Sequence, residues 1–150
     1  MTVTVRLTAA AQPLFSEAAE LFDEYRQHYG ANPAPEAVGD WIRDQMITDR
    51  LRVFAAGGDD DVRAILTVSV VPASLTLRTV WLIRDLYVDP GARREGLGRA
   101  LLAHVAEAAR EEGAHRLSLQ TEPDNVRALH LYARAGFEPV TEVVQWARVL

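Results

Sequence analysis

The 150-residue sequence contains no cysteine and no lysine, and these absences narrow the chemistry open to it. Without cysteine the chain has no disulfide, no thiolate nucleophile and no thiolate-ligated zinc or iron–sulfur site. Because lysine is missing, all 16 basic residues are arginine. The formal net charge is -5. This acidity argues against a nucleic-acid partner, because proteins that bind nucleic acid usually carry a basic face.

Long apolar runs are also missing. No stretch approaches the roughly 20 apolar residues that a membrane-spanning helix requires. The first ten residues, MTVTVRLTAA, lack the charged start and apolar block of a signal peptide. We therefore expect a cytoplasmic protein with no membrane partner. The content of 49% hydrophobic and 25% charged residues is ordinary for a globular chain. The length, without repeats or linkers, predicts a single domain over residues 1–150.

Hydrophobic periodicity predicts a mixed sheet with helices on its faces. Strands are expected at 2–8, 51–57, 62–71, 78–88 and 115–121, with a last extended segment at 140–150. Helices are expected at 14–29, 35–47, 97–112 and 124–135. The order is β-α-α-β-β-β-α-β-α-β. It predicts an α/β (mixed α+β) fold that begins with antiparallel strands and ends with β-α-β units.

The stretch VDPGARREGLGRALL, residues 88–102, gathers three glycines and three arginines between a predicted central strand and a helix. The first turn of a helix has backbone N–H groups without partners in the helix, and the positive end of its dipole lies there. Glycines let a ligand approach the backbone, and arginines supply forked donors for phosphate. The stretch therefore predicts an anion site, with diphosphate as the common occupant. A tight turn with solvated arginines is the alternative.

Two specific phosphate motifs are excluded. Gly91 and Gly96 have the spacing of a P-loop, but Leu97 and Gly98 stand where Lys and Ser or Thr are required. Gly96 and Gly98 begin a dinucleotide fingerprint, but Leu101 stands where its third glycine belongs. The stretch therefore predicts a phosphate loop of another kind.

Two other motifs occur in order along the chain. A strand ending in Leu-x-Val-x-Pro leads into Arg-x-x-Gly-x-Gly, here Leu86, Val88, Pro90, Arg93, Gly96 and Gly98. The second motif is NVRALHLYARAGF, residues 125–137. Together they resemble the GNAT superfamily of N-acetyltransferases, with the first motif as its pyrophosphate loop. The segment VWLIRDLYVDPGARREGLGRALL looks closest to the small-amine and polyamine/histone-type branch.

The resemblance implies acetyl transfer from acetyl-CoA, as co-substrate, to a primary amine of a small molecule or peptide by direct attack. It implies cofactor contacts from the strand, the loop and the later helix, at Leu86, Tyr87, Val88, Arg93, Arg94, Glu95, Gly96, Leu97, Gly98, Arg99, Asn125, Ala128 and Tyr132. The strand N–H groups would orient the thioester and polarise its carbonyl. No metal is implied, and the four histidines share no ligand spacing.

The resemblance also implies a general acid at Tyr132, which would protonate the departing thiolate. A buried core aromatic is the alternative for this residue. Asp85, an acid inside an apolar strand, is the candidate general base, directly or through a water. Its alternatives are an ion pair with Arg84 or an edge facing water. The family often has an acidic residue where this chain has Arg84, which leaves other water-linked bases open.

Tyr25 and Tyr29, in EYRQHYG, are expected to touch the acceptor together with Asp85, because the corresponding region lines the acceptor pocket in related folds. A partly buried amphipathic face is the alternative. The C-terminal EVVQWARVL could pair across chains in a homodimer. The rival function is a non-catalytic acyl-CoA-binding or sensor domain, and a generic nucleotide-binding domain is a third interpretation.

Overall fold

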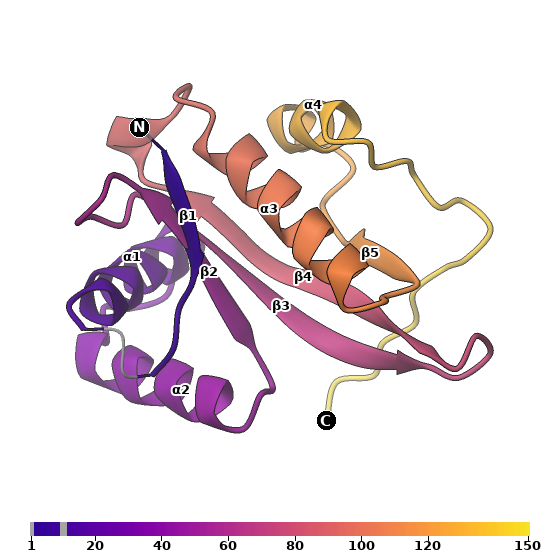
Figure 1. Ribbon diagram of the computed structural model, residues 1–150, viewed down its shortest axis with the longest axis horizontal. Helices are drawn as coiled ribbons and strands as arrows, with labels where there is room; N and C mark the ends of the chain where they lie inside the picture. The colour runs from indigo at the N-terminus through magenta and orange to yellow at the C-terminus, as the bar shows by residue number, and fades with distance from the viewer. Residues whose placement is uncertain (1, 10–11) are drawn as a thin grey trace. The chain divides into compact units, whose positions relative to one another are not determined.

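The computed structural model describes residues 2–9 and 12–150 (Figure 1). The chain divides into two compact units, Met1–Gln120 and Thr121–Leu150. None of the helices within the described ranges has the length and apolarity to cross a bilayer. Whether the chain folds as one domain stays a prediction.

The first unit is built on a five-stranded sheet in the order β1-β2-β3-β4-β5. The strands are β1 (Val3–Arg6), β2 (Arg52–Gly57), β3 (Ala64–Ala73), β4 (Arg78–Val88) and β5 (Arg116–Leu119). Neighbouring strands from β1 to β4 pair antiparallel, and β5 pairs parallel to β4. The predicted mixed sheet, antiparallel first and then joined by a β-α-β unit, is confirmed.

Helices cover both faces of this sheet (Figure 1). The residues of β2 show which helices cover each face, because successive strand residues point to opposite faces. Val53 and Ala55 are buried in a core shared with α1 (Leu14–His28) and α2 (Pro35–Ile47). Phe54 points the other way and its ring lies 5.8 Å from that of His104 in α3 (Leu97–Glu111). One face of the sheet therefore carries α1 and α2, and the other carries α3.

The pairing of β3 with β4 contains one irregularity. Thr67 pairs with Asp85 and the next residue, Val68, pairs with Ile83, so Arg84 is an extra residue in β4. This arrangement is a β-bulge, in which two residues of one strand oppose one of its partner. Because side chains alternate with a period of two, one extra residue exchanges the faces for the rest of the strand.

The contacts on either side of the bulge show this exchange. Before it, Trp81 lies on the α3 face, with its ring 6.4 Å from that of Phe54. After it, Asp85 accepts a hydrogen bond from Tyr25 of α1, and Tyr87 is buried in the core that α1 and α2 share. The bulge therefore turns the end of β4 toward α1.

The second unit contains α4 (Val126–Arg134). The Asn125 side chain caps this helix by accepting a hydrogen bond from the Ala128 N–H at 3.3 Å, as one of the two predicted caps. The predicted extended strand at 140–150 is wrong, since these residues have no regular secondary structure. Apolar side chains there, such as Trp146, are exposed, and without a partner strand an extended segment gains no ladder of hydrogen bonds.

Candidate active site

The loop after β4 begins with a compact turn. The Asp89 side chain accepts a hydrogen bond from the Gly91 N–H at 3.1 Å and starts η1 (Pro90–Ala92). The same carboxylate lies 3.4 Å from the Arg63 guanidinium, and the Asp89 N–H donates to the Arg63 carbonyl at 2.8 Å. The loop is thus fastened to Arg63, directly before β3, ahead of its exposed arginines.

The start of α3 has the backbone that an anion site needs. Gly96 precedes the helix with a φ of +79°, in the left-handed region that favours glycine. No side chain caps this end of the helix. Leu97 and Gly98 are buried, so it is the first-turn backbone and not their side chains that can serve a ligand.

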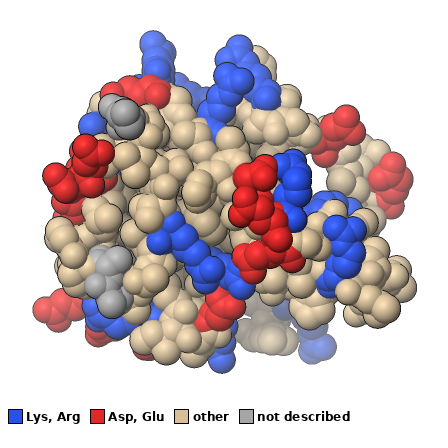
Figure 2. Space-filling view, viewed as in Figure 1, with Lys and Arg blue, Asp and Glu red and all other residues tan. Residues whose placement is uncertain are grey.

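Charged side chains surround this backbone. Arg93, Arg94, Glu95 and Arg99 are all exposed, and Arg94 itself has a φ of +69°. A basic side chain projects at the upper left of the space-filling view, where Figure 1 places the loop between η1 and α3 (Figure 2). The first-turn backbone and the exposed guanidinium groups together fit a diphosphate.

The last residues of β4 extend beyond the end of its pairing with β5. Pairing between β4 and β5 extends from Val80 with Arg116 to Ile83 with Leu119. Residues 86–88, predicted to contact the cofactor, lie beyond that last pair. Their backbone is the part of the central strand that leads directly into the loop.

Asp85 is held on both carboxylate oxygens. The Tyr25 hydroxyl donates to Oδ1 at 3.0 Å, and the Thr67 hydroxyl donates to Oδ2. Thr67 is fully buried, whereas Asp85 is half-buried. Arg84 is exposed, and no ion pair between it and Asp85 occurs in the described residues. The site carboxylate is therefore held by hydroxyl donors, one from α1 and one from β3.

Four rings gather beside Asp85 and form what we call the ring cluster: Tyr25, His28, Tyr29 and Tyr87. The Tyr25 ring lies 5.3 Å from that of Tyr29 and 5.6 Å from that of Tyr87. The His28 ring lies 5.2 Å from Tyr29 and 6.3 Å from Tyr87. The predicted acceptor residues Tyr25 and Tyr29 therefore lie together, and Tyr25 connects the cluster to Asp85.

Charges act on the buried member of the cluster. Burial raises the pKa of the Tyr87 hydroxyl, and the Glu24 carboxylate raises this pKa further. The Arg93 guanidinium opposes that effect and lies 6.0 Å from the centre of the Tyr87 ring. Arg93 thus connects the phosphate-type loop with the ring cluster.

In the second unit the predicted residues lie on α4. Ala128 and Tyr132 are four residues apart, so they share a face of the helix. Tyr132 is half-buried, and its ring lies 6.0 Å from that of Phe137 in an edge-on arrangement. Asn125 uses its side-chain oxygen as the helix cap described above.

Thr67 is a site residue that the sequence did not indicate. A threonine in an apolar strand is typical of sheets, so its type gives no functional signal. Its role depends on the register that places it opposite Asp85.

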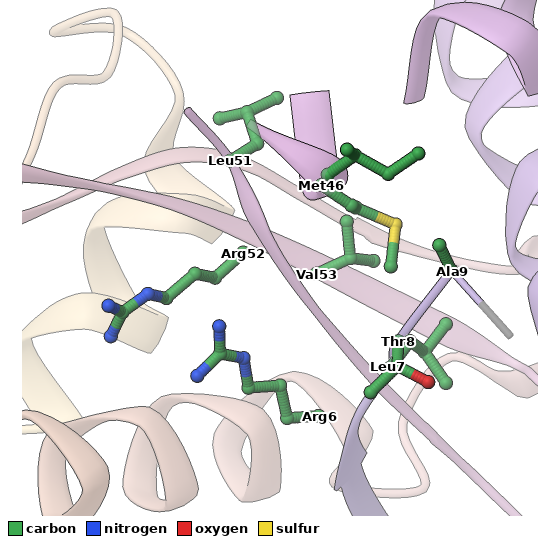
Figure 3. Close-up of a pocket in the computed structure, with 9 residues that line it drawn as sticks. Arg6, Leu7, Thr8, Ala9, Met46, Leu51, Arg52 and Val53 are labelled. Carbon is green, nitrogen blue, oxygen red and sulfur yellow. The ribbon is translucent and has the colours of Figure 1, made fainter. Parts of the chain in front are cut away.

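A cavity of about 390 Å³ lies elsewhere in the first unit (Figure 3). It is lined by the end of β1 and the start of β2, which are opposite the loop end of the sheet according to the strand register. The guanidinium groups of Arg6 and Arg52 lie on one side and apolar side chains such as Met46 and Val53 on the other (Figure 3). No predicted site residue lines this cavity. Across the described ranges, no group of three or more His, Cys, Asp or Glu residues is placed to hold a metal.

The bulged central strand leads into the uncapped start of α3, an arrangement suited to bind a diphosphate such as that of CoA, and comparisons with known proteins give the family. Residues 15–137 match the acetyltransferase (GNAT) family. The chain therefore belongs to this family and is an acetyl-CoA-dependent N-acetyltransferase.

Individual proteins show how far the similarity extends. The chain is 27% identical over 128 residues to an uncharacterized N-acetyltransferase of Bacillus subtilis, covering 85% of this chain and 86% of that protein. It is 40% identical over 89 residues to streptothricin acetyltransferase of Streptomyces lavendulae, covering 59% of this chain and 45% of that protein. A solved probable acetyltransferase matches with a TM-score of 0.90 and 27% identity, covering 99% and 97% of the two chains. An aminoglycoside acetyltransferase from a soil metagenomic sample shares the fold, with a TM-score of 0.82, 21% identity and coverage of 99% and 96%.

Proposed function

We propose that the chain transfers the acetyl group of acetyl-CoA to a primary amine of a small molecule or peptide that binds beside Asp85. The observation that carries this proposal is the half-buried Asp85 carboxylate, held by two hydroxyl donors near the end of β4. A fixed carboxylate at the strand that leads into the loop is suited to orient an ammonium group and to accept its proton. Streptothricin acetyltransferase, an acetyltransferase named for a small molecule, supports an acceptor of that kind.

Two backbone stretches would hold the co-substrate. The N–H groups of the first turn of α3, with Arg93, Arg94 and Arg99 beside them, would bind the diphosphate. Backbone N–H groups of residues 86–88 would orient the thioester and stabilise negative charge on its oxygen. Asn125 and Ala128 are assigned to the pantetheine arm through the family motif. Acetyl-CoA supplies the activated acyl group.

Two side chains of the protein would transfer protons during the reaction. Asp85 would accept a proton from the amine, directly or through a water, so that the nitrogen can form its bond to the acetyl carbon. Tyr132 would donate a proton to the sulfur as the carbon–sulfur bond breaks. This assignment of Tyr132 depends on the position of the tyrosine in the family motif.

Tyr132→Phe separates this enzyme from a non-catalytic acyl-CoA sensor. We expect the variant to lower kcat by about a hundred- to ten-thousandfold, because general acids typically contribute such factors, and to leave CoA binding unchanged. Turnover is measured as CoA thiol release with a thiol reagent, to which a chain without cysteine adds no background. Undiminished turnover would remove Tyr132 from the mechanism. No wild-type turnover with any amine, while CoA still raises Tm, would favour the sensor.

A cytoplasmic location and a homodimer stay predictions. Light scattering behind size exclusion would decide the second.

A further inference from the structure

We infer that the acceptor is a monocationic amine carried on a flat aromatic body, with its ammonium group at Asp85 and its body against the ring cluster. This inference rests on the proposed function and adds the chemical class of the acceptor. It concerns only residues of the first unit, whose mutual contacts are described above.

The ring cluster provides an apolar aromatic surface beside the carboxylate. Tyr29 is 63% exposed, so it is accessible to a bound molecule. It meets the Tyr25 ring at an interplanar angle of 72°, and Tyr25 in turn donates its hydroxyl hydrogen bond to Asp85 at 3.0 Å. A ring surface that ends at a fixed carboxylate matches a molecule with an aromatic body and a terminal ammonium.

Geometry in the cluster favours a flat body over a bulky aliphatic one. The Tyr29 ring is edge-on to both neighbours, at 72° to Tyr25 and 89° to His28. Aromatic pairs prefer such edge-to-face or offset arrangements over a face-to-face sandwich, and they contribute about 0.5–1.5 kcal/mol beyond the area they bury. A further ring placed on Tyr29 would extend the same pattern.

The local charge favours one positive charge on the acceptor. The carboxylates of Asp85 and Glu24 act at the cluster, and the Arg93 guanidinium lies over Tyr87. The Asp89 carboxylate also acts on Tyr87, but it is paired with Arg63. No ion pair of Arg93 occurs among the described residues, so these two carboxylates against one guanidinium leave one net negative charge. A monocation neutralises it, whereas each further charge of a polyamine would meet the field of Arg93.

The position of Arg93 is a reason to place the acceptor at the Tyr29 end of the ring cluster. The guanidinium of Arg93 already occupies the face of the Tyr87 ring, 6.0 Å from its centre. At the Tyr87 end of the cluster, a cation of the protein itself thus lies over the ring. The ring of Tyr29, at the other end, is exposed and is the one that the acceptor can reach.

The test compares three amines with the full-length protein: 2-phenylethylamine, 2-cyclohexylethylamine and spermidine. The first two have the same chain and charge and differ in the aromatic character of the ring. We expect kcat/KM for 2-phenylethylamine to exceed that for 2-cyclohexylethylamine by about three- to tenfold, as aromatic pairs contribute, and to exceed that for spermidine. Equal use of the two ring amines, or preference for spermidine, would overturn the inference.

Variants then locate the preference. Tyr29→Leu should abolish the preference for the aromatic amine, and Tyr29→Phe should keep it. Trp41→Leu is the matched control, since Trp41 is 50% exposed on α2 and lies outside the ring cluster. If Tyr29→Leu keeps the preference, the inference is wrong although amine acetylation stands. If no amine is acetylated at all, while CoA still raises Tm, the proposed function fails as well.

Discussion

Thr67 offers the sharpest test of how the site carboxylate is held. Thr67→Val keeps the side-chain shape in a fully buried position and removes the hydroxyl that donates to Asp85. Hydrogen bonds to charged groups contribute about 1.5–3 kcal/mol to stability. Because Asp85 is half-buried and water can replace part of the interaction, we expect the lower part of this range, about 1.5 kcal/mol. In a chain of this length that corresponds to a Tm lower by roughly 3–6 °C.

Thr67→Ser is the matched control. It keeps the hydroxyl and removes one methyl group, which costs about 1 kcal/mol of buried apolar surface. The two variants therefore lose similar stability for different reasons. Only Thr67→Val should release Asp85, and a displacement of about 1 Å can cost roughly a hundredfold in rate. We expect kcat/KM for the amine to fall roughly ten- to a hundredfold in Thr67→Val and less than about threefold in Thr67→Ser.

The assay is CoA release with the amine varied, together with thermal unfolding in the presence and absence of CoA. The KM for acetyl-CoA should stay the same in both variants, because Thr67 lies on β3 and not in the loop. The reasoning is refuted if Thr67→Val keeps wild-type kcat/KM, or if both variants lose activity in proportion to their lost stability.

Two further predictions concern the loop and the ring cluster. Gly96→Ala should cost about 1 kcal/mol of unfolding free energy, because L-residues are strained at a φ of +79°, and it should weaken the rise in Tm that CoA produces. Gly39→Ala, inside α2 with open space around it, should stabilise by about 0.5–1 kcal/mol and leave that rise intact. Burial raises the pKa of Tyr87 above its ordinary value of 10.0, so the stability linked to its neutral form is fully present below that pH and is lost as pH rises through the higher folded pKa. As the pH rises above about 10, the Tm of Tyr87→Phe should therefore fall less than the Tm of wild type; equal slopes would show that Tyr87 does not carry the effect.

Much of the fold could be predicted from local patterns. The observed α2 has the predicted bounds, because Pro35 suits the first turn of a helix and apolar residues follow at helical spacing. The predicted bounds of β4 are also those observed, since a nearly continuous apolar run is typical of a strand covered on both faces. The prediction of an extended strand at 140–150 was wrong because alternating apolar residues make a strand only where a partner strand pairs with them.

The contacts of the candidate site could not be predicted from local sequence patterns. Tyr25 and Asp85 are 60 positions apart, and Thr67 and Asp85 are 18 apart. Both contacts depend on the packing of α1 and on strand register, which no window along the chain contains. An acid inside an apolar strand was the one local signal, and it identified the carboxylate without its partners.

The bulge at Arg84 explains why the sequence did not predict the face of the sheet to which Asp85 points. With strict alternation from Trp81, Asp85 would point to the α3 face, whose neighbouring side chains include Phe54 and no hydroxyl donor from α1. A carboxylate buried there without donors would be costly. One extra residue in β4 instead turns Asp85 toward Tyr25 and Thr67. The same shift brings Tyr87 into the ring cluster. A single irregularity of the sheet thus places both the carboxylate and Tyr87 on the face where we propose that the amine binds.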